Sequence, residues 1–494
     1  MLKNSKLNPV FFQIEKNKIS KTFLSKTSTL IVVKNSKGGS EFFKDLPLSA
    51  VYIKKIQGQK KNQDLVFTLD NSNLTTVVVT HYEDKDQFNG LVWARTLLSK
   101  YHTQLTPEVC ILFDESINQD VVSRSLWMAA SAQSFELENF KSKKSTKPIK
   151  LKRLKFLNAL DPQIHSKLSA QIEGNNLARW LTALPPNKLD AKNYITFLKS
   201  YSINEGLAFD FYSEKKLHAL NAGAFLAVSQ GNKDRDAGIV KIAYKGNPDN
   251  KNIDLGLIGK GIIFDTGGNN LKPFQYMLDM HTDMEGSAVA LGLLHAIHKN
   301  KEKINVELWL AITENRLSST AYKSQDIITA SNGVTIQTIH TDAEGRMVLA
   351  DTLNLASKSK PKLMLDFATL TGACESALTD KYSGVFTNDE NLHPLLIEAG
   401  RESGERVWPF PMDNDYLELI DSDVADIKQC SESGGGDHIL ASKFLEKFVG
   451  KNIKWVHTDL SSGFTKSGLG HIPTRVTGFG INFGYKFLEK IKLI

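Results

Sequence analysis

Residues 253–268 read IDLGLIGKGIIFDTGG, and this stretch decides the fold class of the chain. Its apolar side chains run almost without interruption from Ile253 to Phe264, which is typical of a parallel strand covered on both faces. Similar runs recur at residues 239–244, 306–312 and 363–367, separated by segments with helical spacing. The pattern predicts an α/β domain with a central mixed, mostly parallel sheet. Ligands bind such sheets beyond the carboxyl ends of the strands, where Asp265 follows the run.

A second, smaller α/β domain is expected in the first 140 residues, where short β-branched runs again alternate with helical stretches. Eight of the fifteen residues at 141–155 are Lys or Arg, a composition typical of an exposed connection. A helix is predicted at residues 162–184, ended by Pro185 and Pro186 because proline has no amide proton. The expected organisation is an amino-terminal domain at 1–155, a connecting helix at 156–187 and a second domain at 188–494.

Composition describes an ordinary globular protein. The 494 residues are 41% hydrophobic and 23% charged, with 61 Lys plus Arg against 54 Asp plus Glu, so a disordered or histone-like chain is excluded. The three cysteines are far apart and odd in number, which favours a reducing, cytoplasmic compartment over a disulfide framework. No apolar run approaches the roughly 18 residues of a membrane-spanning helix, so no membrane association is expected.

Charged residues gather in three segments of the second domain. Lys260 and Asp265 lie in the quoted stretch, followed by Lys272, and Asp283 precedes a predicted helix. The third segment is TDAEGR at residues 341–346; if it is extended, Asp342, Glu344 and Arg346 point to one side. A salt-bridged surface turn would explain the third segment alone equally well.

Together these segments predict a metal centre. Four carboxylates at strand ends repel one another and raise one another's pKa unless cations neutralise them. Two divalent ions bridged by carboxylates would do so, and would activate water for hydrolysis of an amide, ester or phosphoester. A phosphate-binding loop is disfavoured because the GxxxxGK[ST] spacing fails around Lys260.

The ordered motifs resemble the leucine aminopeptidase family of dinuclear metallo-exopeptidases. They are GKGIIFDTGG at 259–268, LKP at 271–273, DM at 283–284, TDAEGR at 341–346, LAD at 349–351 and DFATLTGA at 366–373. The resemblance covers roughly residues 170–485 and is weak in the amino-terminal part. It implies a macro-like amino-terminal domain, a linker helix, a larger catalytic domain and a homohexamer of two trimers that acts on short peptides.

The resemblance also implies a role for each charged residue. Asp265 and Glu344 would bridge two metal ions, Zn²⁺ or Mn²⁺ in the first instance. The remaining metal ligands would be Asp342 at one ion and Lys260 with Asp283 at the other. Lys272 would polarise the scissile carbonyl, and Arg346 would hold a bicarbonate that acts as general base.

The pocket for the first side chain is implied in the same way. It would be lined by Met280, Thr369 and Gly372, with Leu370 contacting substrate through its backbone, which favours an apolar first residue such as leucine. Ordinary core packing is the alternative for Met280 and Thr369. The substrate's free α-amine would bind the second metal, which restricts cleavage to amino-terminal residues.

Several positions depart from the family pattern, among them Ser287 and residues 316–321, and two of them carry charge or a possible ligand. His340 stands where the family usually has Asn, and would be an extra ligand or, more simply, a hydrogen-bonding partner of the ligands. Glu285 replaces a small residue and would either add a carboxylate near the metals or point away along the helix. These departures keep open a non-catalytic scaffold, or a DNA-binding member of the family suggested by the net charge of +7 and the basic run.

Overall fold

The computed structural model describes residues 7–15, 19–36, 47–60, 63–83, 86–114, 116–143, 151–157, 160 and 166–494. The chain divides into two compact units. The smaller unit comprises Ser5–Ile172 with Gly468–Pro473, and the larger comprises Glu173–Ser467 with Thr474–Ile494. The division falls within helix α5 (Leu168–Thr182), so the predicted connecting helix exists but contributes residues to both units.

The smaller unit contains a six-stranded sheet in the order β1-β6-β5-β2-β4-β3, parallel except for the β3–β4 pair. Alternate residues of β2 face opposite sides: Ile31 and Val33 pack with α3 and α4, while Leu30 and Val32 pack with α1 and α2. The elements are β1 (Phe11–Ile14), α1 (Lys21–Leu24), β2 (Thr29–Asn35), α2 (Ala50–Gln57), β3 (Leu65–Thr68), β4 (Thr76–Tyr82), α3 (Gln87–Lys100), β5 (Glu108–Phe113), α4 (Gln119–Ser134) and β6 (Arg153–Phe156).

The smaller unit extends beyond the boundary expected at residue 155. That position lies inside β6, which pairs with both β1 and β5 and therefore belongs to this sheet. The basic run ends in this strand, where Arg153 and Lys155 both form ion pairs with Glu108, at 3.3 and 2.5 Å. Residues 144–150 of the run lie outside the described residues.

The larger unit contains an eight-stranded mixed sheet in the order β15-β14-β17-β13-β9-β10-β8-β7. Strands β13, β9 and β10 are mutually parallel, as their apolar runs predicted, and β17 is parallel to β13. The run at residues 239–244 instead lies in β8, which pairs antiparallel with β10, and β14 and β7 likewise pair antiparallel with β17 and β8. The strands are β7 (Ala208–Ser213), β8 (Gly238–Lys245), β9 (Leu255–Asp265), β10 (Asn305–Asn315), β13 (Leu363–Ala368), β14 (Ser383–Thr387), β15 (Val407–Pro409) and β17 (Lys454–Asp459). A separate small sheet contains β11 (Ile327–Thr329), β12 (Thr335–Gln337) and β16 (Ile427–Lys428).

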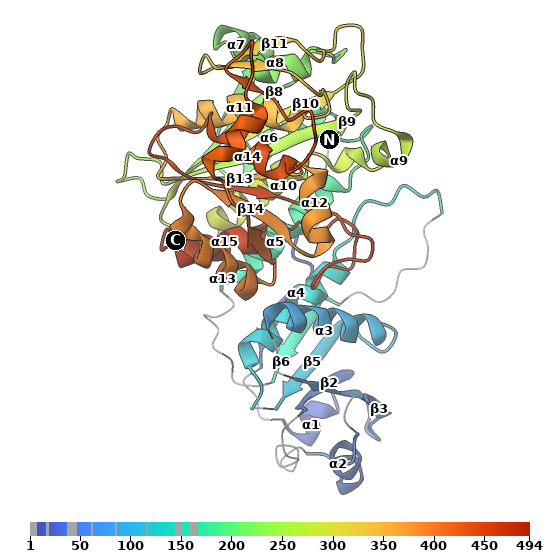
Figure 1. Ribbon diagram of the computed structural model, residues 1–494. Coiled ribbons are helices and arrows are strands. Elements are labelled where there is room, and N and C mark those ends of the chain that lie inside the picture. The colour runs from blue at the N-terminus through green and yellow to red at the C-terminus, as the bar shows by residue number, and fades with distance from the viewer. Residues whose placement is uncertain are drawn as a thin grey trace. The chain divides into compact units, whose positions relative to one another are not determined.

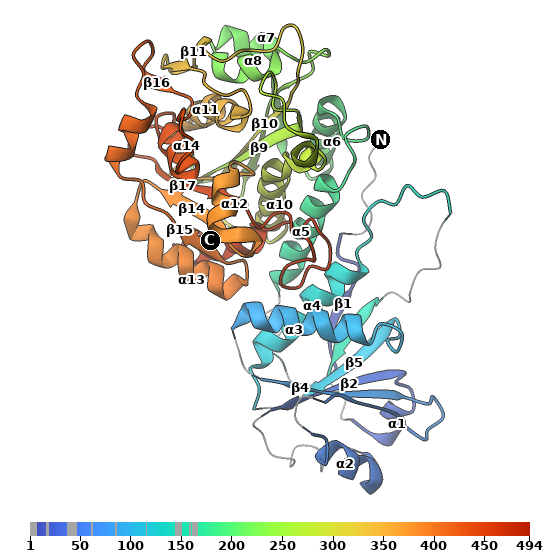
Figure 2. The ribbon, with the colours of Figure 1, turned by 45° about the vertical axis from the view of Figure 1, so that its right-hand side comes forward.

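Helices cover both faces of the large sheet (Figures 1 and 2). Helices α6, α10 and α15 pack on one face, and α8, α11 and α14 on the other. The helices are α6 (Ala191–Asn204), α7 (Glu214–Ala219), α8 (Gly223–Ser229), α9 (Phe274–Met277), α10 (Glu285–Lys299), α11 (Glu344–Ser357), α12 (Gly372–Leu378), α13 (His393–Ser403), α14 (Asp437–Glu446) and α15 (Ile481–Lys490), with 3-10 turns η2 (Met280–Thr282), η3 (Thr379–Lys381), η4 (Glu390–Leu392) and η5 (Asn414–Ile420).

Strand β9 lies at the centre of this sheet and in close contact with α10. A Cβ atom on Gly259 would lie 2.5 Å from Ser287 Cα, so only glycine allows the helix to approach this part of the strand. The approach places the start of α10 against the middle of β9, at Gly259 and Gly261. The loop after β9 therefore follows a central strand that is covered by helices on both faces of the sheet.

Two sequence-based expectations concern the chain as a whole. Among the described residues, no helix combines the length and apolar character needed to cross a bilayer. Cys110, Cys374 and Cys430 are all buried and none forms a disulfide.

Candidate metal centre and substrate cavity

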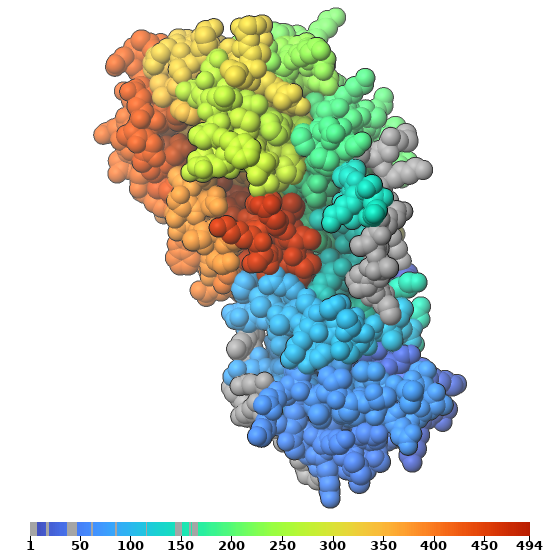
Figure 3. Space-filling view, turned by 90° about the vertical axis from the view of Figure 1, so that its right-hand side faces the viewer, coloured from blue at the N-terminus to red at the C-terminus, as the bar shows by residue number. Residues whose placement is uncertain are grey.

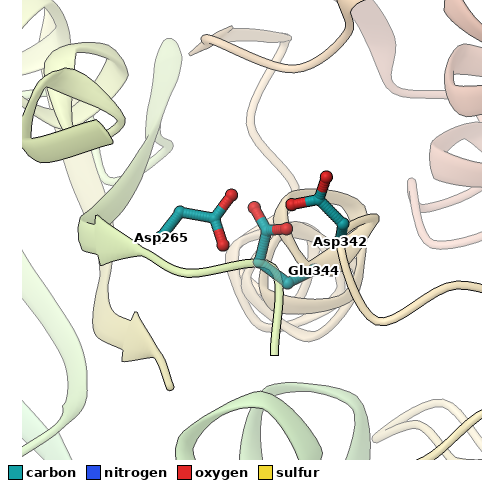
Figure 4. Close-up of side chains that lie close together, drawn as sticks. All are labelled: Asp265, Asp342 and Glu344. Carbon is teal, nitrogen blue, oxygen red and sulfur yellow. The ribbon is translucent and has the colours of Figure 1, made fainter. Parts of the chain in front are cut away.

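Three carboxylates converge at the carboxyl end of β9. Asp265 is the last residue of the strand, and the chain then turns through Gly267 and Gly268, whose φ angles are +85° and +65°. The side-chain oxygens of Asp265, Asp342 and Glu344 lie within 4.8 Å of one another (Figure 4).

Residues 341–346 are not extended, so the condition under which Asp342, Glu344 and Arg346 would point to one side is not met. Asp342 lies in a turn, and Glu344 is the first residue of α11, a helix buried over nearly its whole length against the sheet. Asp342 and Glu344 therefore converge because a turn leads into a helix, and not because strand alternation aligns them. Arg346 lies two residues further along the helix, and its guanidinium contacts Gln429 and Asp437 instead of the three carboxylates.

Two lysines neutralise this cluster. Lys260 Nζ lies 2.8 Å from Asp283 Oδ1 and 3.0 Å from Glu344 Oε1, and it donates to the Thr369 carbonyl at 2.8 Å. Lys272 Nζ lies 2.8 Å from Asp265 Oδ2 and also pairs with Asp342. The structure thus brings together the six residues expected as ligands and as the carbonyl-polarising lysine.

Burial and mutual repulsion shift the pKa values of these groups. Burial, with repulsion from neighbouring carboxylates, raises the pKa of Asp265, that of Asp283 to about 7 and that of Asp342 to about 8. Glu344 differs from the expectation of a raised pKa: burial opposes its charge, but Lys260 and Lys272 hold its pKa below the ordinary value. For both lysines burial also opposes the charge, and the surrounding carboxylates nevertheless raise the pKa.

The cluster suits a divalent cation. Carboxylate oxygens are ligands for Mn²⁺, Mg²⁺ and Zn²⁺, and three of them converge here from different elements. Asp283 supplies a further oxygen, because its Oδ2 is buried and accepts no hydrogen bond from any described residue. A buried carboxylate oxygen without a donor is costly unless a cation binds it. The residues present therefore fit a bound metal ion.

A cavity of about 420 Å³ adjoins the cluster. Met280, Thr369, Leu370 and Gly372, the four residues expected to contact substrate, all line it together with Lys260, Lys272 and the carboxylates. Besides β9 and the start of α11, its lining comes from the segments after β9, after β13 and after β17, and those parts of the chain adjoin on one face in yellow-green, orange and red (Figure 3). Thr369 Oγ1 donates to Asp283 Oδ1 at 2.6 Å, so this threonine contacts the cluster directly.

Comparison with known proteins is decisive at this point. The model of the cytosol aminopeptidase family, catalytic domain, matches residues 176–483. The chain belongs to the cytosol aminopeptidase family. It is 34% identical to a probable cytosol aminopeptidase of Ehrlichia ruminantium (strain Gardel) over 417 residues, covering 83% of this chain and 82% of that protein. It is 35% identical to that of Wolbachia pipientis wMel over 371 residues, covering 73% of each, and 34% identical to that of Prochlorococcus marinus (strain MIT 9215) over 444 residues, covering 88% and 90%.

A solved structure shares the fold of this family member. The bottromycin maturation enzyme BotP in complex with Mn superposes with a TM-score of 0.81 at 23% identity, covering 94% of this chain and 99% of that one. The likeness establishes the two-unit α/β architecture. Family membership makes the chain a metal-dependent hydrolase of the aminopeptidase class.

Arg346 of the aminopeptidase is buried, and its contacts are with Gln429 and Asp437. Its Nη1 donates to the Gln429 carbonyl at 3.1 Å, and its Nη2 lies 2.6 Å from Asp437 Oδ2. Its Nε is buried and makes no hydrogen bond to any described residue, so the Nε–H is available to an anion. Arg346 is absent from the cavity lining, in contrast to the other six charged residues.

The two departures from the family pattern have different outcomes. His340 is exposed, and its Nδ1 accepts a hydrogen bond from the Asp342 N–H at 3.3 Å, the hydrogen-bonding role expected for it. Glu285 is fully buried, and its Oε2 would lie 2.3 Å from a Cβ on Gly463. Glu285 therefore points toward Gly463 and does not line the cavity.

Four further residues support the centre and were not predicted. Asn315 ends β10 beside Asp265 and donates to its Oδ1 at 2.8 Å. Asp459 ends β17 and accepts from the Leu370 N–H at 3.0 Å, so it fixes the loop after β13. A polar residue at the end of an apolar run was the available signal for both. Gln429 and Asp437, which contact Arg346, had no local signal.

Proposed function

We propose that this chain is an aminopeptidase that removes an apolar amino-terminal residue, such as leucine, from short peptides. The observation that carries the proposal is the common cavity: the carboxylate and lysine cluster shares it with Met280, Thr369, Leu370 and Gly372. A volume of about 420 Å³ suits a small ligand. Met280 contributes an apolar wall, while Gly372 leaves room for the incoming side chain.

Two divalent ions, Zn²⁺ or Mn²⁺, would be held by Asp265, Glu344, Asp342, Lys260 and Asp283. When bound, such ions supply Lewis acidity and a hydroxide nucleophile near neutral pH. Lys260 must lose its proton to act as a ligand, and a nearby cation favours that loss. Its position is set beforehand, because Nζ is held by the Thr369 carbonyl as well as by two carboxylates.

Lys272 is the residue placed to act on the substrate. Its side chain is 14% exposed and lines the cavity, so the ammonium can reach a peptide carbonyl there. A cation at that position stabilises negative charge on the carbonyl oxygen as the amide is attacked. Asp265 and Asp342 hold Lys272 in place and keep it protonated.

Arg346 would hold a bicarbonate through its buried Nε–H, which makes no hydrogen bond to any described residue. The carboxylate of Asp437 already occupies Nη2, so the guanidinium has both an internal partner and a free donor. Turnover in bicarbonate-free buffer, compared with the same buffer supplemented with bicarbonate, tests this role. Stimulation supports it, and an unchanged rate contradicts it.

The test of the proposed function is release of leucine from Leu-p-nitroanilide and Leu-Gly. Purified protein is assayed after treatment with EDTA and again after addition of Mn²⁺ or Zn²⁺, with Glu344→Ala as the control. Turnover that metal restores and that the variant lacks supports the proposal. A folded, metal-loaded protein that releases no residue from any peptide in a panel would contradict it and favour a scaffold.

Assembly and compartment remain proposals of the same kind. We propose a homohexamer, and a group of exposed apolar residues beside the cavity supports burial against another copy: Leu271, Phe274, Tyr276 and Leu278. Measurement of the molar mass in solution tests it. A cytoplasmic location is supported by the unpaired cysteines and the relatives' description as cytosol aminopeptidases. DNA binding stays the alternative prediction; of the basic run, Arg153 and Lys155 pair with Glu108.

A further inference from the structure

A carboxylate without a cationic partner stands at the edge of the substrate cavity. Glu375 lies in α12, three residues after Gly372, and lines the cavity with it. Residues three apart in a helix share a face, so Glu375 continues the wall that Gly372 begins. Its side chain is exposed, in contrast to the carboxylates of the metal centre, of which Asp265, Asp283 and Glu344 are buried and Asp342 is half-buried.

The other charged side chains around the cavity have partners, and for Asp459 these are the Leu370 N–H and the Thr371 hydroxyl instead of a cation. Lys260 and Lys272 pair with the carboxylates of the metal centre. Asp279, which also lines the cavity, pairs with Arg475 at 3.0 Å. In the part of the chain that the structure describes, no Lys, Arg or His forms an ion pair with Glu375.

The walls of the cavity are partly apolar. Met280 and Phe464 both line the cavity, and the Arg475 guanidinium packs over the Phe464 ring at 4.4 Å, which holds that ring in place. Burial decreases from the metal centre through the half-buried Met280 and Phe464 to the exposed Glu375, so a side chain that extends from the centre toward solvent passes apolar groups before it reaches the carboxylate. Lysine and arginine have this order of groups, an aliphatic stem followed by a cation.

We propose that Glu375 extends the specificity of the cavity to peptides with an amino-terminal lysine or arginine. The inference rests on the proposed aminopeptidase function and names a second substrate class for the same site. The aliphatic stem of the substrate packs along the walls that also accept leucine. The cationic end forms an ion pair with the Glu375 carboxylate near solvent.

The experiment compares kcat/KM for the 7-amino-4-methylcoumarin amides of lysine, norleucine and leucine. Norleucine has the four-carbon stem of lysine without the ammonium group, so the ratio of lysine to norleucine isolates the charge. In Glu375→Gln this ratio should fall about two- to fivefold, the range expected for an exposed ion pair. In the unmodified enzyme it should also fall as NaCl rises from 20 to 500 mM, because salt screens exposed charges.

Glu418→Gln is the matched control, since Glu418 is exposed, lies outside the cavity lining and changes the net charge equally. Its ratio should equal that of the unmodified enzyme. The inference is overturned if Glu375→Gln leaves the ratio unchanged, or if both variants lower it equally. Failure to hydrolyse any of the three amides would instead overturn the proposed function, and the two failures are therefore distinguishable.

Discussion

Replacement of Glu285 by Gln should change how the stability of the protein depends on pH. Glu285 is fully buried at the start of α10, and burial raises the pKa of its carboxyl from 4.5 to about 8, with only the Gly478 backbone N–H favouring the charged form. Above pH 4.5 the unfolded chain releases this proton while the folded protein keeps it. Stability therefore falls as pH rises from about 4.5 to about 8, and is level beyond.

The magnitude follows from the interval between the two pKa values. At about 1.4 kcal/mol for each pH unit, the loss amounts to about 5 kcal/mol at most. For a unit of about 300 residues the entropy of unfolding is about 0.6 kcal/mol per degree, so the change in Tm is about 8 °C. Gln has nearly the same shape and cannot ionise, so the variant lacks this loss.

Thermal unfolding of both proteins, followed by tryptophan fluorescence between pH 5 and 8.5 at fixed metal concentration and scan rate, measures the effect. The difference in Tm, Glu285→Gln minus unmodified, should grow by several degrees across this range. Glu418→Gln, at an exposed position, should give a constant difference. Parallel curves for Glu285→Gln and the unmodified protein would refute the reasoning, because a carboxyl ionised in both states cannot produce the slope.

Three further substitutions test the site. Glu344→Gln should lower activity by more than about 100-fold and reduce bound metal, measured by elemental analysis; full metal content would refute its role as a bridging ligand. Asp459→Asn weakens the hold on the Leu370 backbone and should lower kcat/KM about tenfold with metal content unchanged, and unaltered kinetics would exclude a positioning role. Asp437→Asn leaves the buried guanidinium of Arg346 without its carboxylate and should lower the free energy of unfolding by about 1–3 kcal/mol. This is less than for a fully buried pair, because Asp437 is 30% exposed; an unshifted Tm would show that the pair contributes nothing to stability.

The local pattern of apolar and polar residues predicted features that depend on one strand or helix alone. The apolar runs gave the parallel central strands, because burial on both faces leaves a continuous apolar signature. The local pattern did not determine the conformation of residues 341–346, because two carboxylates two residues apart fit a strand as well as a turn before a helix. It also failed at residue 155, because basic side chains pointing to solvent do not show that β6 pairs with β1 and β5.

The sequence by itself determined the chemistry: the types, order and spacing of the carboxylates and lysines were sufficient to predict a metal centre and to show a family resemblance. The tertiary structure decided which groups meet. Asn315 reaches Asp265 across 50 positions, Asp437 reaches Arg346 across 91, and Asp459 reaches Leu370 across 89. Periodicity reports only the face that an element buries, whereas these contacts depend on strand order and register. For the same reason, only the folded chain shows that Glu375 shares a cavity with the metal centre.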